Sequence, residues 1–544
     1  MLFNSYTFIL GFLPVVLPGF FVIARLAGAG AAAAWLAGAS LVLYGWWNPW
    51  FVLLLLASIG FNFVAGQALV RARSSAGGTR TLLVLAVGAN LALLGAFKYA
   101  NFFIGIANDL EAGPFARVSW VLPLGISFFT FTQIAFLVDV SRGLASEYRF
   151  IHYLLFVTWF PHLVAGPIIH HAQVMPQFTQ PDTYVPRVHL LSTGLTLFCL
   201  GLGKKVLLAD SLADYAIPVF DAADAGRPLS ALAAWTGVVA YSLQLYFDFS
   251  GYSDMACGLS LMFGVRLPIN FNSPYKAWNI IEFWRRWHMT LSTFLRDYLY
   301  VPLGGNRKGR ARRHVNLMIT MLLGGLWHGA SWNFVVWGAV HGALLSLNHG
   351  WHQVRGALGF PASGAPALAG RAIGVVLTLN AVMLAWIPFR CADLASTRRM
   401  LASMLGPEAW VTSGDRSAAF MAWLARAPAD WFAGTPPNLW GIDAGAGLPL
   451  IALGLAIVLL APNSVEIVGA SAVYQAGGES PAPPDGLAPG GGPRVGGAEA
   501  GNAGPSRSLW QWRPGLGWAV LVGVVLAASF LNLSRVSPFL YFQF

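Results

Sequence analysis

Glu282-Phe-Trp-Arg-Arg-Trp-His288 and Gly325-Leu-Trp-His-Gly-Ala-Ser-Trp332 are the two segments that decide the fold. A basic run, Arg307-Lys-Gly-Arg-Ala-Arg-Arg313, lies between them, and the residues from Val315 to Trp327 carry no charge. If these uncharged residues are helical, they rise roughly 20 Å at about 1.5 Å per residue. Because clustered Lys and Arg stay on the cytoplasmic side of a membrane, such a helix carries His328 well into the hydrocarbon layer.

An ionisable side chain at that depth is unfavourable, and it usually marks a cavity or a pathway. An imidazole that titrates near neutral pH can take a proton from a hydroxyl group, and apolar surroundings keep it neutral beforehand. We therefore interpret His328 as a candidate general base. A histidine that only hydrogen-bonds a neighbouring helix is the alternative.

The segment around His288 has a different pattern. Projection at about 100° per residue puts Trp284, Trp287, Leu291, Phe294, Leu295 and Tyr298 on one side, and Arg285, His288, Ser292 and Arg296 on the other. This pattern predicts an amphipathic helix that lies along the membrane boundary or lines a wet cavity. On such a helix His288 has either a functional role or a place on a solvated polar face. The functional roles open to it are orienting a substrate, stabilising a negatively charged oxygen and relaying a proton.

The composition places the whole chain in a membrane. Its 544 residues are 56% hydrophobic and only 10% charged, with a mean hydropathy of +0.61, whereas about 25% of the residues in soluble domains are charged. The formal net charge is +11. Since the positive residues lie in short loops between apolar runs, they set the topology and meet anionic lipid headgroups. We therefore expect membrane lipid as a partner and no nucleic acid.

The apolar runs predict an all-α polytopic integral membrane protein with about 11 to 15 transmembrane or re-entrant helices. They cover roughly residues 7–24, 31–59, 81–107, 119–140, 150–169, 188–208, 231–249, 254–265, 315–327, 332–348, 371–389, 446–461 and 516–533. Several are too long or too short for one span of about 20 residues. Long runs are therefore expected to hold two helices. The first run lacks a basic leader region, so we expect it to be a retained membrane helix.

Two stretches interrupt this pattern and set the predicted domains. Residues 402–445 contain Gly406-Pro407 and Pro436-Pro437, which indicates an extramembrane loop within a membrane domain covering 1–474. Residues 475–508 are rich in Gly, Pro, Ala and Ser, and such a segment cannot bury a core, so we expect a disordered linker. A C-terminal transmembrane helix and tail, 509–544, follow it, with the helix over Leu516 to Phe530.

No pattern predicts a metal site or a bound cofactor. Cys199, Cys257 and Cys391 lie far apart in or beside apolar segments, without C-x-x-C spacing. The 11 histidines include no H-E-x-x-H pattern, and the chain has no Walker or G-x-G-x-x-G motif. We therefore expect no metal, no bound cofactor and no nucleotide hydrolysis.

The motifs resemble the membrane-bound O-acyltransferase (MBOAT) family, and within it the bacterial alginate O-acetylase branch. Phe283-Trp-x-x-Trp-His288 followed by Gly325-Leu-Trp-His328-Gly is similar to the core of the family. Further segments similar to that branch are Tyr246-Phe-Asp-Phe-Ser-Gly-Tyr-Ser-Asp254, Phe271-Asn-Ser-Pro-Tyr275, Arg296-Asp-Tyr-Leu-Tyr-Val-Pro-Leu-Gly-Gly305, Phe160-Pro-His-Leu-Val-Ala-Gly-Pro167 and Pro538-Phe-Leu-Tyr-Phe-Gln-Phe544. Apart from the last segment, these motifs run from residue 160 to residue 329.

The resemblance implies a central tunnel, an acetyl donor such as acetyl-CoA on the cytoplasmic side, and an exported polysaccharide such as alginate as the acceptor. It implies that His328 is the catalytic residue at the narrow point of the tunnel and that His288 is a second, more variable polar residue. It further implies a bacterial inner-membrane location and a periplasmic partner that resembles a serine esterase. Two alternatives stay open: a D-alanyl transferase acting on teichoic acid, which shares the core motifs, and a polysaccharide transporter without chemistry.

Other candidate site residues accompany the two histidines. Trp284, Trp287, Trp327 and Trp332 are candidates for the wall of the reaction cavity. Asp248 and Asp254 are acids in a membrane segment, and we expect them to line the cavity, to hydrogen-bond helix ends or to pair with the basic run. Arg307, Lys308 and Arg310 are candidates for attracting a phosphorylated donor, although topology explains them equally well.

Overall fold

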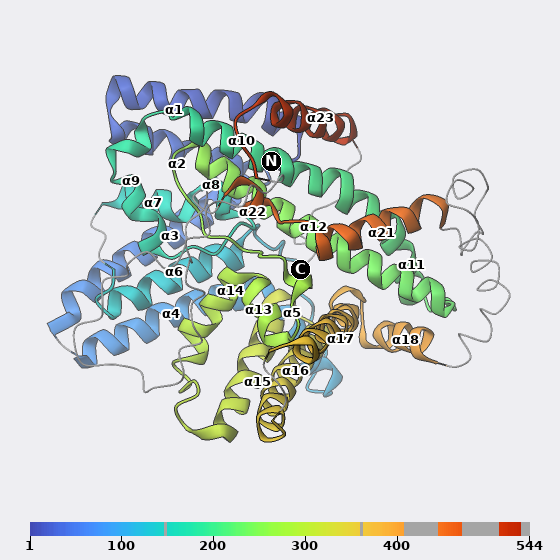
Figure 1. Ribbon diagram of the computed structural model, residues 1–544. Coiled ribbons are helices and arrows are strands. Elements are labelled where there is room, and N and C mark those ends of the chain that lie inside the picture. Colours follow the sequence, from blue (N-terminus) through green and yellow to red (C-terminus); the bar gives the residue numbers. More distant parts are fainter. Residues whose placement is uncertain (75, 146–148, 360–362, 407–443, 470–510, 535–544) are drawn as a thin grey trace.

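The computed structural model describes residues 1–534, apart from 75, 146–148, 360–362, 407–443 and 470–510. Helices make up most of this part of the chain (Figure 1), which confirms the predicted all-α membrane class. The predicted linker, 475–508, and most of the predicted extramembrane loop, 402–445, lie outside the described residues.

Most of the N-terminal helices lie together on the left of Figure 1, and α5 (Ala100–Asp109) lies apart from them near the centre. The N-terminal helices are η1 (Thr7–Phe12), α1 (Leu13–Ala27), α2 (Ala29–Gly45), α3 (Trp50–Arg71), η2 (Ala72–Ser74), α4 (Ala76–Lys98), α5, α6 (Ile126–Ser141), α7 (Phe150–Thr158), α8 (Phe160–Leu163) and α9 (His171–Phe178). α1 packs against α2, and α6 packs against both α3 and α4. The long apolar runs 31–59 and 81–107 each hold two helices, as the sequence predicts.

The central helix is α12 (Ala231–Met262), which packs against α10 (Val188–Gly203), η4 (Lys204–Ala209) and α11 (Asp210–Asp224). The short η3 (Pro181–Tyr184) precedes α10. The sequence predicts two apolar runs, 231–249 and 254–265, where the structure has one continuous helix. That prediction is wrong because the acids of the intervening motif form ion pairs inside the helix packing, so no loop is needed to keep them in water.

Glycines bring α10 and α12 into close contact. A Cβ atom on Gly201 would lie 2.5 Å from the carbonyl oxygen of Gly251, and one on Gly194 would lie 2.6 Å from that of Gly258. Without side chains at these crossing points the two backbones can approach each other, as small residues allow in membrane helix pairs.

The C-terminal half carries the Phe-Trp-x-x-Trp-His and Gly-Leu-Trp-His motifs. Its elements are η5 (Pro274–Lys276), α13 (Ile280–Arg286), α14 (Met289–Leu295), η6 (Arg296–Tyr300), α15 (Gly309–His328), α16 (Trp332–Ala357), α17 (Ala365–Arg390), α18 (Leu394–Leu405), α21 (Ala444–Leu460), α22 (Ser464–Val468) and α23 (Leu516–Asn532). α16 packs against both α15 and α17. The last helix begins at the predicted residue.

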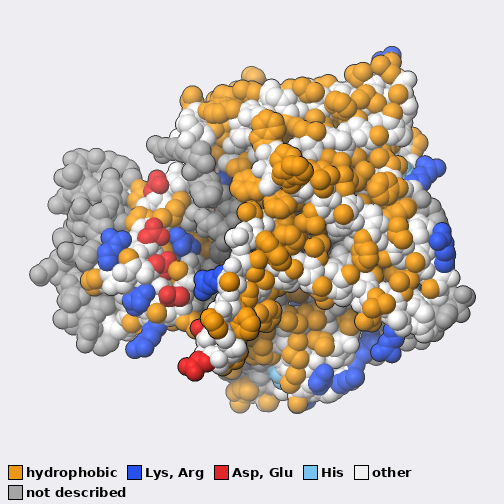
Figure 2. All heavy atoms as spheres, turned by 180° about the vertical axis from the view of Figure 1, so that it is seen from behind, with side chains coloured by type: hydrophobic (Ala, Val, Ile, Leu, Met, Phe, Trp, Pro, Cys, Tyr) orange, Lys and Arg blue, Asp and Glu red, His pale blue; other side chains and the backbone are white. Residues whose placement is uncertain are grey.

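Five helical spans in the described residues are long and apolar enough to cross a membrane: Thr7–Ala27, Trp50–Arg71, Gly77–Lys98, Val188–Asp224 and Ala365–Arg390. Shorter apolar helices are Ala29–Gly45, Ile126–Ser141, Gly447–Leu460 and Leu516–Asn532. Figure 2 shows apolar side chains over most of one face, with Lys and Arg toward its margins. The protein is therefore a multi-pass membrane protein, and the number of 11 to 15 spans stays a prediction.

Candidate active site

His328 is the last residue of α15, and the chain turns directly afterwards into α16. The residue is 6% exposed, and its ring packs edge-on against the rings of Trp327, Trp337 and Phe389, with centroids 4.9, 5.1 and 5.1 Å away. The helix predicted over 315–327 is confirmed. The imidazole lies in an aromatic, water-poor environment, which favours the neutral ring that a general base requires.

Gly325 fixes the contact between α15 and α16 one turn before His328. A Cβ atom at this position would lie 2.2 Å from the carbonyl oxygen of Phe334. Neither backbone can move away without separating the two helices. The glycine of the Gly-Leu-Trp-His motif is therefore required by packing, and it brings the end of α15 against the start of α16.

A cavity of about 130 Å³ reaches His328. Its lining includes Trp47, Lys98, Ser127, Trp327 and His328. The cavity lies at the C-terminal end of α15, whereas the basic run Arg307–Arg313 lies at the N-terminal end. Because the basic run is predicted to be cytoplasmic, the cavity is on the predicted extracytoplasmic side of the imidazole. Since one water occupies roughly 30 Å³ in the liquid, the cavity has room for a small substrate group.

Lys98, which the sequence analysis missed, holds the end of α15. Its ammonium group donates hydrogen bonds to the backbone carbonyl of Trp327 and to that of His328, the latter at 3.1 Å. The hydroxyl of Tyr99 donates to the carbonyl of Leu326 at 2.8 Å. Two adjacent residues at the end of α4 thus satisfy carbonyls that the helix terminus leaves without intrahelical partners. The available signal was that Lys98 is the only charge in the apolar run 81–107.

His288 lies between α13 and α14 in a left-handed conformation, with φ of 43°. The continuous amphipathic helix predicted through this segment is therefore wrong. The backbone N–H of Met289 donates to the carbonyl of Asn270 at 2.9 Å, and this pairing with another segment is incompatible with a helix through His288. His288 is only 1% exposed, so the alternative prediction, that it belongs to a solvated polar face, is also wrong.

A hydrogen bond sets the tautomer of His288. Its Nδ1 lies 3.0 Å from Oδ1 of Asn270, and the same Oδ1 accepts from the backbone N–H and the hydroxyl of Thr290. Because a backbone N–H can only donate, this Asn270 atom is the amide oxygen, and Nδ1 of His288 carries the proton. In the neutral ring Nε2 is then the basic nitrogen.

The structure brings the two histidines together. Their ring centroids are 6.5 Å apart, and the ring of Trp327 lies 6.1 Å from that of His288. His288 comes from the segment after α13, whereas His328 ends α15, so the pair exists only in the folded chain. At this separation both imidazoles can act on one substrate group placed between them.

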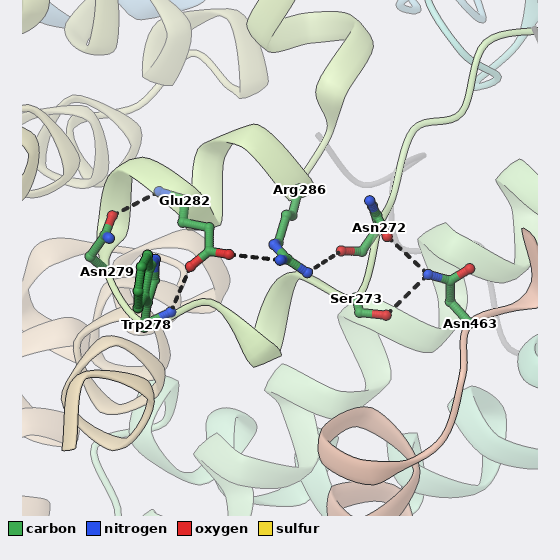
Figure 3. A network of polar contacts seen from close by, with 7 residues as sticks. All are labelled: Asn272, Ser273, Trp278, Asn279, Glu282, Arg286 and Asn463. Atoms are coloured by element: carbon green, nitrogen blue, oxygen red, sulfur yellow. Dashed lines mark hydrogen bonds and ion pairs between the residues drawn. The ribbon is translucent and has the colours of Figure 1, made fainter. Parts of the chain in front are cut away.

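A polar network holds α13 and thereby places the residues before His288 (Figure 3). Glu282 pairs with Arg286 at 2.7 Å and accepts a hydrogen bond from the backbone of Trp278. The remaining links are Asn279 to the backbone of Glu282, Arg286 to the carbonyl of Asn272, and Asn463 to the side chains of Asn272 and Ser273. Arg286, which is paired with Glu282, therefore anchors α13 to 272–273 and, through these residues, to Asn463.

The four tryptophans have different surroundings. Trp327 lines the cavity at His328. Trp284 is buried and donates to Nδ1 of His341 at 3.3 Å, and Trp287 is buried beside Phe283 and Trp386. Trp332 is 53% exposed and contacts Phe102. The structure thus places Trp327 in direct contact with His328 and directs Trp332 outward.

Asp248 and Asp254 form ion pairs with two lysines of η4. Lys205 lies 2.6 Å from Asp248 and 2.7 Å from Asp210, and Lys204 lies 2.7 Å from Asp254. The expected pairing with the basic run Arg307–Arg313 is not found. These buried pairs connect α12 to η4, and the described lining of the cavity at His328 does not include either aspartate.

Arg307, Lys308 and Arg310 are exposed at the start of α15. They lie about 30 Å from His328, since α15 rises about 1.5 Å per residue. Their attraction of a donor stays a prediction. Among the described residues no group of three His, Cys, Asp or Glu could hold a metal ion, and the three cysteines are buried and free.

Comparison with known proteins identifies the family of the chain. The model of the MBOAT, membrane-bound O-acyltransferase family matches residues 107–384. The chain is 40% identical over 432 residues to the peptidoglycan O-acetyltransferase of Helicobacter pylori, covering 75% of this chain and 80% of that protein. It is 41% identical over 421 residues to the probable alginate O-acetylase AlgI of Azotobacter vinelandii, covering 76% and 80%.

A more distant similarity links the chain to another acyl transfer. It is 28% identical over 280 residues to the teichoic acid D-alanyltransferase of Streptococcus thermophilus, covering 49% of this chain and 68% of that protein. The family model covers about half of the chain, and the two O-acetylating relatives are similar over about three quarters of it. The chain belongs to the membrane-bound O-acyltransferase family and is an O-acyltransferase.

Proposed function

We propose that this O-acyltransferase moves an acetyl group from acetyl-CoA, or another cytoplasmic thioester, to a polysaccharide outside the cytoplasm. The observation that carries the proposal is the position of His328 at the buried end of α15, beside His288 and open to a cavity on the predicted extracytoplasmic side. The proposed location is the bacterial inner membrane.

The chemistry follows from the two rings. A hydroxyl oxygen of the acceptor attacks the thioester carbonyl carbon, and Nε2 or Nδ1 of His328 takes the hydroxyl proton. The C–S bond then breaks, and the thiolate leaves and receives a proton, so that the products are an ester and a thiol. His288 is placed to orient the donor or to stabilise the developing oxyanion. The aromatic surroundings exclude water and thereby suppress hydrolysis of the thioester.

The acceptor class rests on the relatives, whose names specify alginate and peptidoglycan. Both are polysaccharides that lie outside the cytoplasm. The proposal therefore includes an exported or envelope polysaccharide as the final acceptor. It also includes a periplasmic partner, resembling a serine esterase, whose own hydroxyl is the attacking group where the transfer is indirect and which then passes the acetyl group to the polysaccharide. The second candidate, D-alanyl transfer, is favoured by the similarity to the teichoic acid enzyme, which covers about half of the chain.

Inside-out membrane vesicles test the donor, because their outer face is cytoplasmic. Vesicles that contain the protein are supplied with acetyl-labelled acetyl-CoA or with a D-alanyl carrier protein, and label in the polysaccharide fraction is counted. We expect acetyl label that depends on the protein and is released by mild base, as esters are. Transfer of D-alanine without transfer of acetate would favour the second candidate, and transfer of neither group would contradict both.

A further inference from the structure

A groove of about 540 Å³ runs between α16 and α17. Leu344, Leu347 and Asn348 line it from α16, Ile373 and Leu377 line it from α17, and residues 278–280 close one part of it. The two helices lie side by side (Figure 1).

The apolar part of the groove is open to the surface of the molecule. Leu347, Ile373 and Leu377 are 70%, 60% and 65% exposed. α17 is one of the five spans that are long and apolar enough to cross a membrane. These side chains therefore face hydrocarbon, and the groove can take an acyl chain along its length.

One end of the groove is basic. His352 and Arg355 line it from the end of α16, and Arg371 lines it from the start of α17. The guanidinium of Arg371 lies 4.2 Å from the ring centroid of Trp278, whose backbone is held by Glu282 (Figure 3). None of the described residues that line the groove is acidic. The charge at this end therefore complements a phosphate group.

The basic end lies on the cytoplasmic side. Arg310 at the start of α15 donates to Gln353 near the end of α16 at 3.5 Å, so these two helix ends are adjacent. The run Arg307–Arg313 belongs to the cytoplasmic face by the distribution of positive charge. The ring centroids of His314 on α15 and His349 on α16 are 6.4 Å apart, which also places these two helix ends together.

A packed layer separates the groove from His328. Trp337, His341 and Trp386 are at most 1% exposed, and the ring of Trp337 lies 4.6 Å from that of His341 and 6.0 Å from that of Trp386. Leu344 and Asn348 lie one and two turns beyond His341 along α16, on the same face. The groove thus ends before the active site, which favours a lipid over the acyl donor as its occupant.

We propose that the groove between α16 and α17 binds an anionic phospholipid of the cytoplasmic leaflet. The phosphate lies between Arg355 and Arg371, and an acyl chain follows Leu347, Ile373 and Leu377. Basic pockets between membrane helices on the cytoplasmic side recognise such headgroups. The lipid stabilises the α16–α17 pair, since a ligand that binds only the folded state shifts unfolding by mass action.

Thermal unfolding of the detergent-purified full chain tests the proposal, with phosphatidylglycerol and phosphatidylcholine of identical chains as probes. We expect phosphatidylglycerol to raise Tm by several degrees and to act at about tenfold lower concentration than phosphatidylcholine. In the double variant Arg355→Gln/Arg371→Gln the advantage of phosphatidylglycerol should disappear. Equal shifts with the two lipids in the wild-type chain would overturn the proposal.

Arg312→Gln is the matched control, because it removes an exposed arginine on the same side that does not line the groove. It should keep the response to phosphatidylglycerol, and loss of that response would show general surface attraction instead. The variant Ala381→Phe fills the groove without changing charge and should weaken the response to both lipids. Soluble glycerol 3-phosphate and CoA complete the test: displacement of labelled phosphatidylglycerol by either at micromolar concentration would indicate a soluble phosphate or donor site and reject the lipid.

Discussion

The ammonium nitrogen of Lys98 lies 3.1 Å from the backbone carbonyl oxygen of His328, although the two residues are 230 positions apart in the sequence. The contact joins the end of α4 to the end of α15, so that the backbone of the candidate base is held by a second helix. The side chain of Lys98 acts here on the backbone of α15. It acts as a positioning residue for the imidazole.

Lys98→Met should lower kcat with little change in KM. The variant keeps most of the apolar stem but loses hydrogen bonds from a charged donor, which typically contribute about 1.5 to 3 kcal/mol each, so we expect a loss of about tenfold to a hundredfold in kcat. Initial rates of acyl transfer over a range of donor concentrations measure both constants. Tyr99→Phe, which removes one neutral hydrogen bond, should have a smaller effect. An unchanged kcat in a folded Lys98→Met protein would show that the contact does not position His328.

Asn270→Ala should reduce acyl transfer almost as much as His288→Ala does. Without the amide oxygen the proton of His288 is no longer confined to Nδ1, and a buried N–H loses its acceptor. The rates of the two single variants and of the double variant form a double-mutant cycle. If the two residues are coupled, the losses of the single variants, expressed as activation free energies, do not add up to the loss of the double variant. The double variant should therefore resemble His288→Ala. Additive losses would mean that Asn270 does not act through His288.

Lys205→Met should destabilise the protein strongly, because it leaves Asp210 and Asp248 buried without their cation. Removal of one partner from a buried ion pair typically costs about 3 to 5 kcal/mol. The exposed pair of Arg187 and Asp182 is the control, and Arg187→Gln should cost less than about 1 kcal/mol. Thermal unfolding in detergent compares the two variants. Similar Tm values would exclude a structural role for the buried pairs.

Gly325→Ala should lower Tm, because the added methyl group would lie 2.2 Å from the carbonyl oxygen of Phe334. Overpacking of this kind typically costs about 1 to 3 kcal/mol or more. Gly95→Ala on α4 is the matched control, since nothing lies within 4 Å of a Cβ atom there. That change should be neutral or stabilising by up to about 1 kcal/mol, as expected from helix propensity. A control variant less stable than Gly325→Ala would contradict the packing account.

Hydrophobic runs and motif residues suffice to predict the membrane class, the helix that ends at His328 and the helix that begins at Leu516. They fail at His288, because the helical projection describes only local sequence, whereas the backbone there pairs with Asn270. They also fail at α12, where the acids look like a helix break until Lys204 and Lys205 are known to lie beside them. Both errors come from contacts between distant segments, which periodicity does not contain.

The site shows the same limit. The motifs predict both histidines, but Lys98 belongs to no motif and is recognisable only as a lone charge in an apolar run. The tryptophans predicted to line the reaction cavity also differ in position, since Trp327 contacts His328 whereas Trp332 faces outward. Sequence patterns identify the residue types that chemistry needs, and the fold decides which of them meet.

The acetyl content of exported polysaccharide in a strain that carries only His328→Ala tests the central claim most directly. Membrane content of the variant is measured in parallel by immunoblotting, and the wild-type chain restores acetylation in the same background. We predict that the variant inserts at the normal level and that acetyl esters fall to the level of the deletion strain, because the alanine side chain cannot take the hydroxyl proton. Normal acetyl content with His328→Ala would contradict the account.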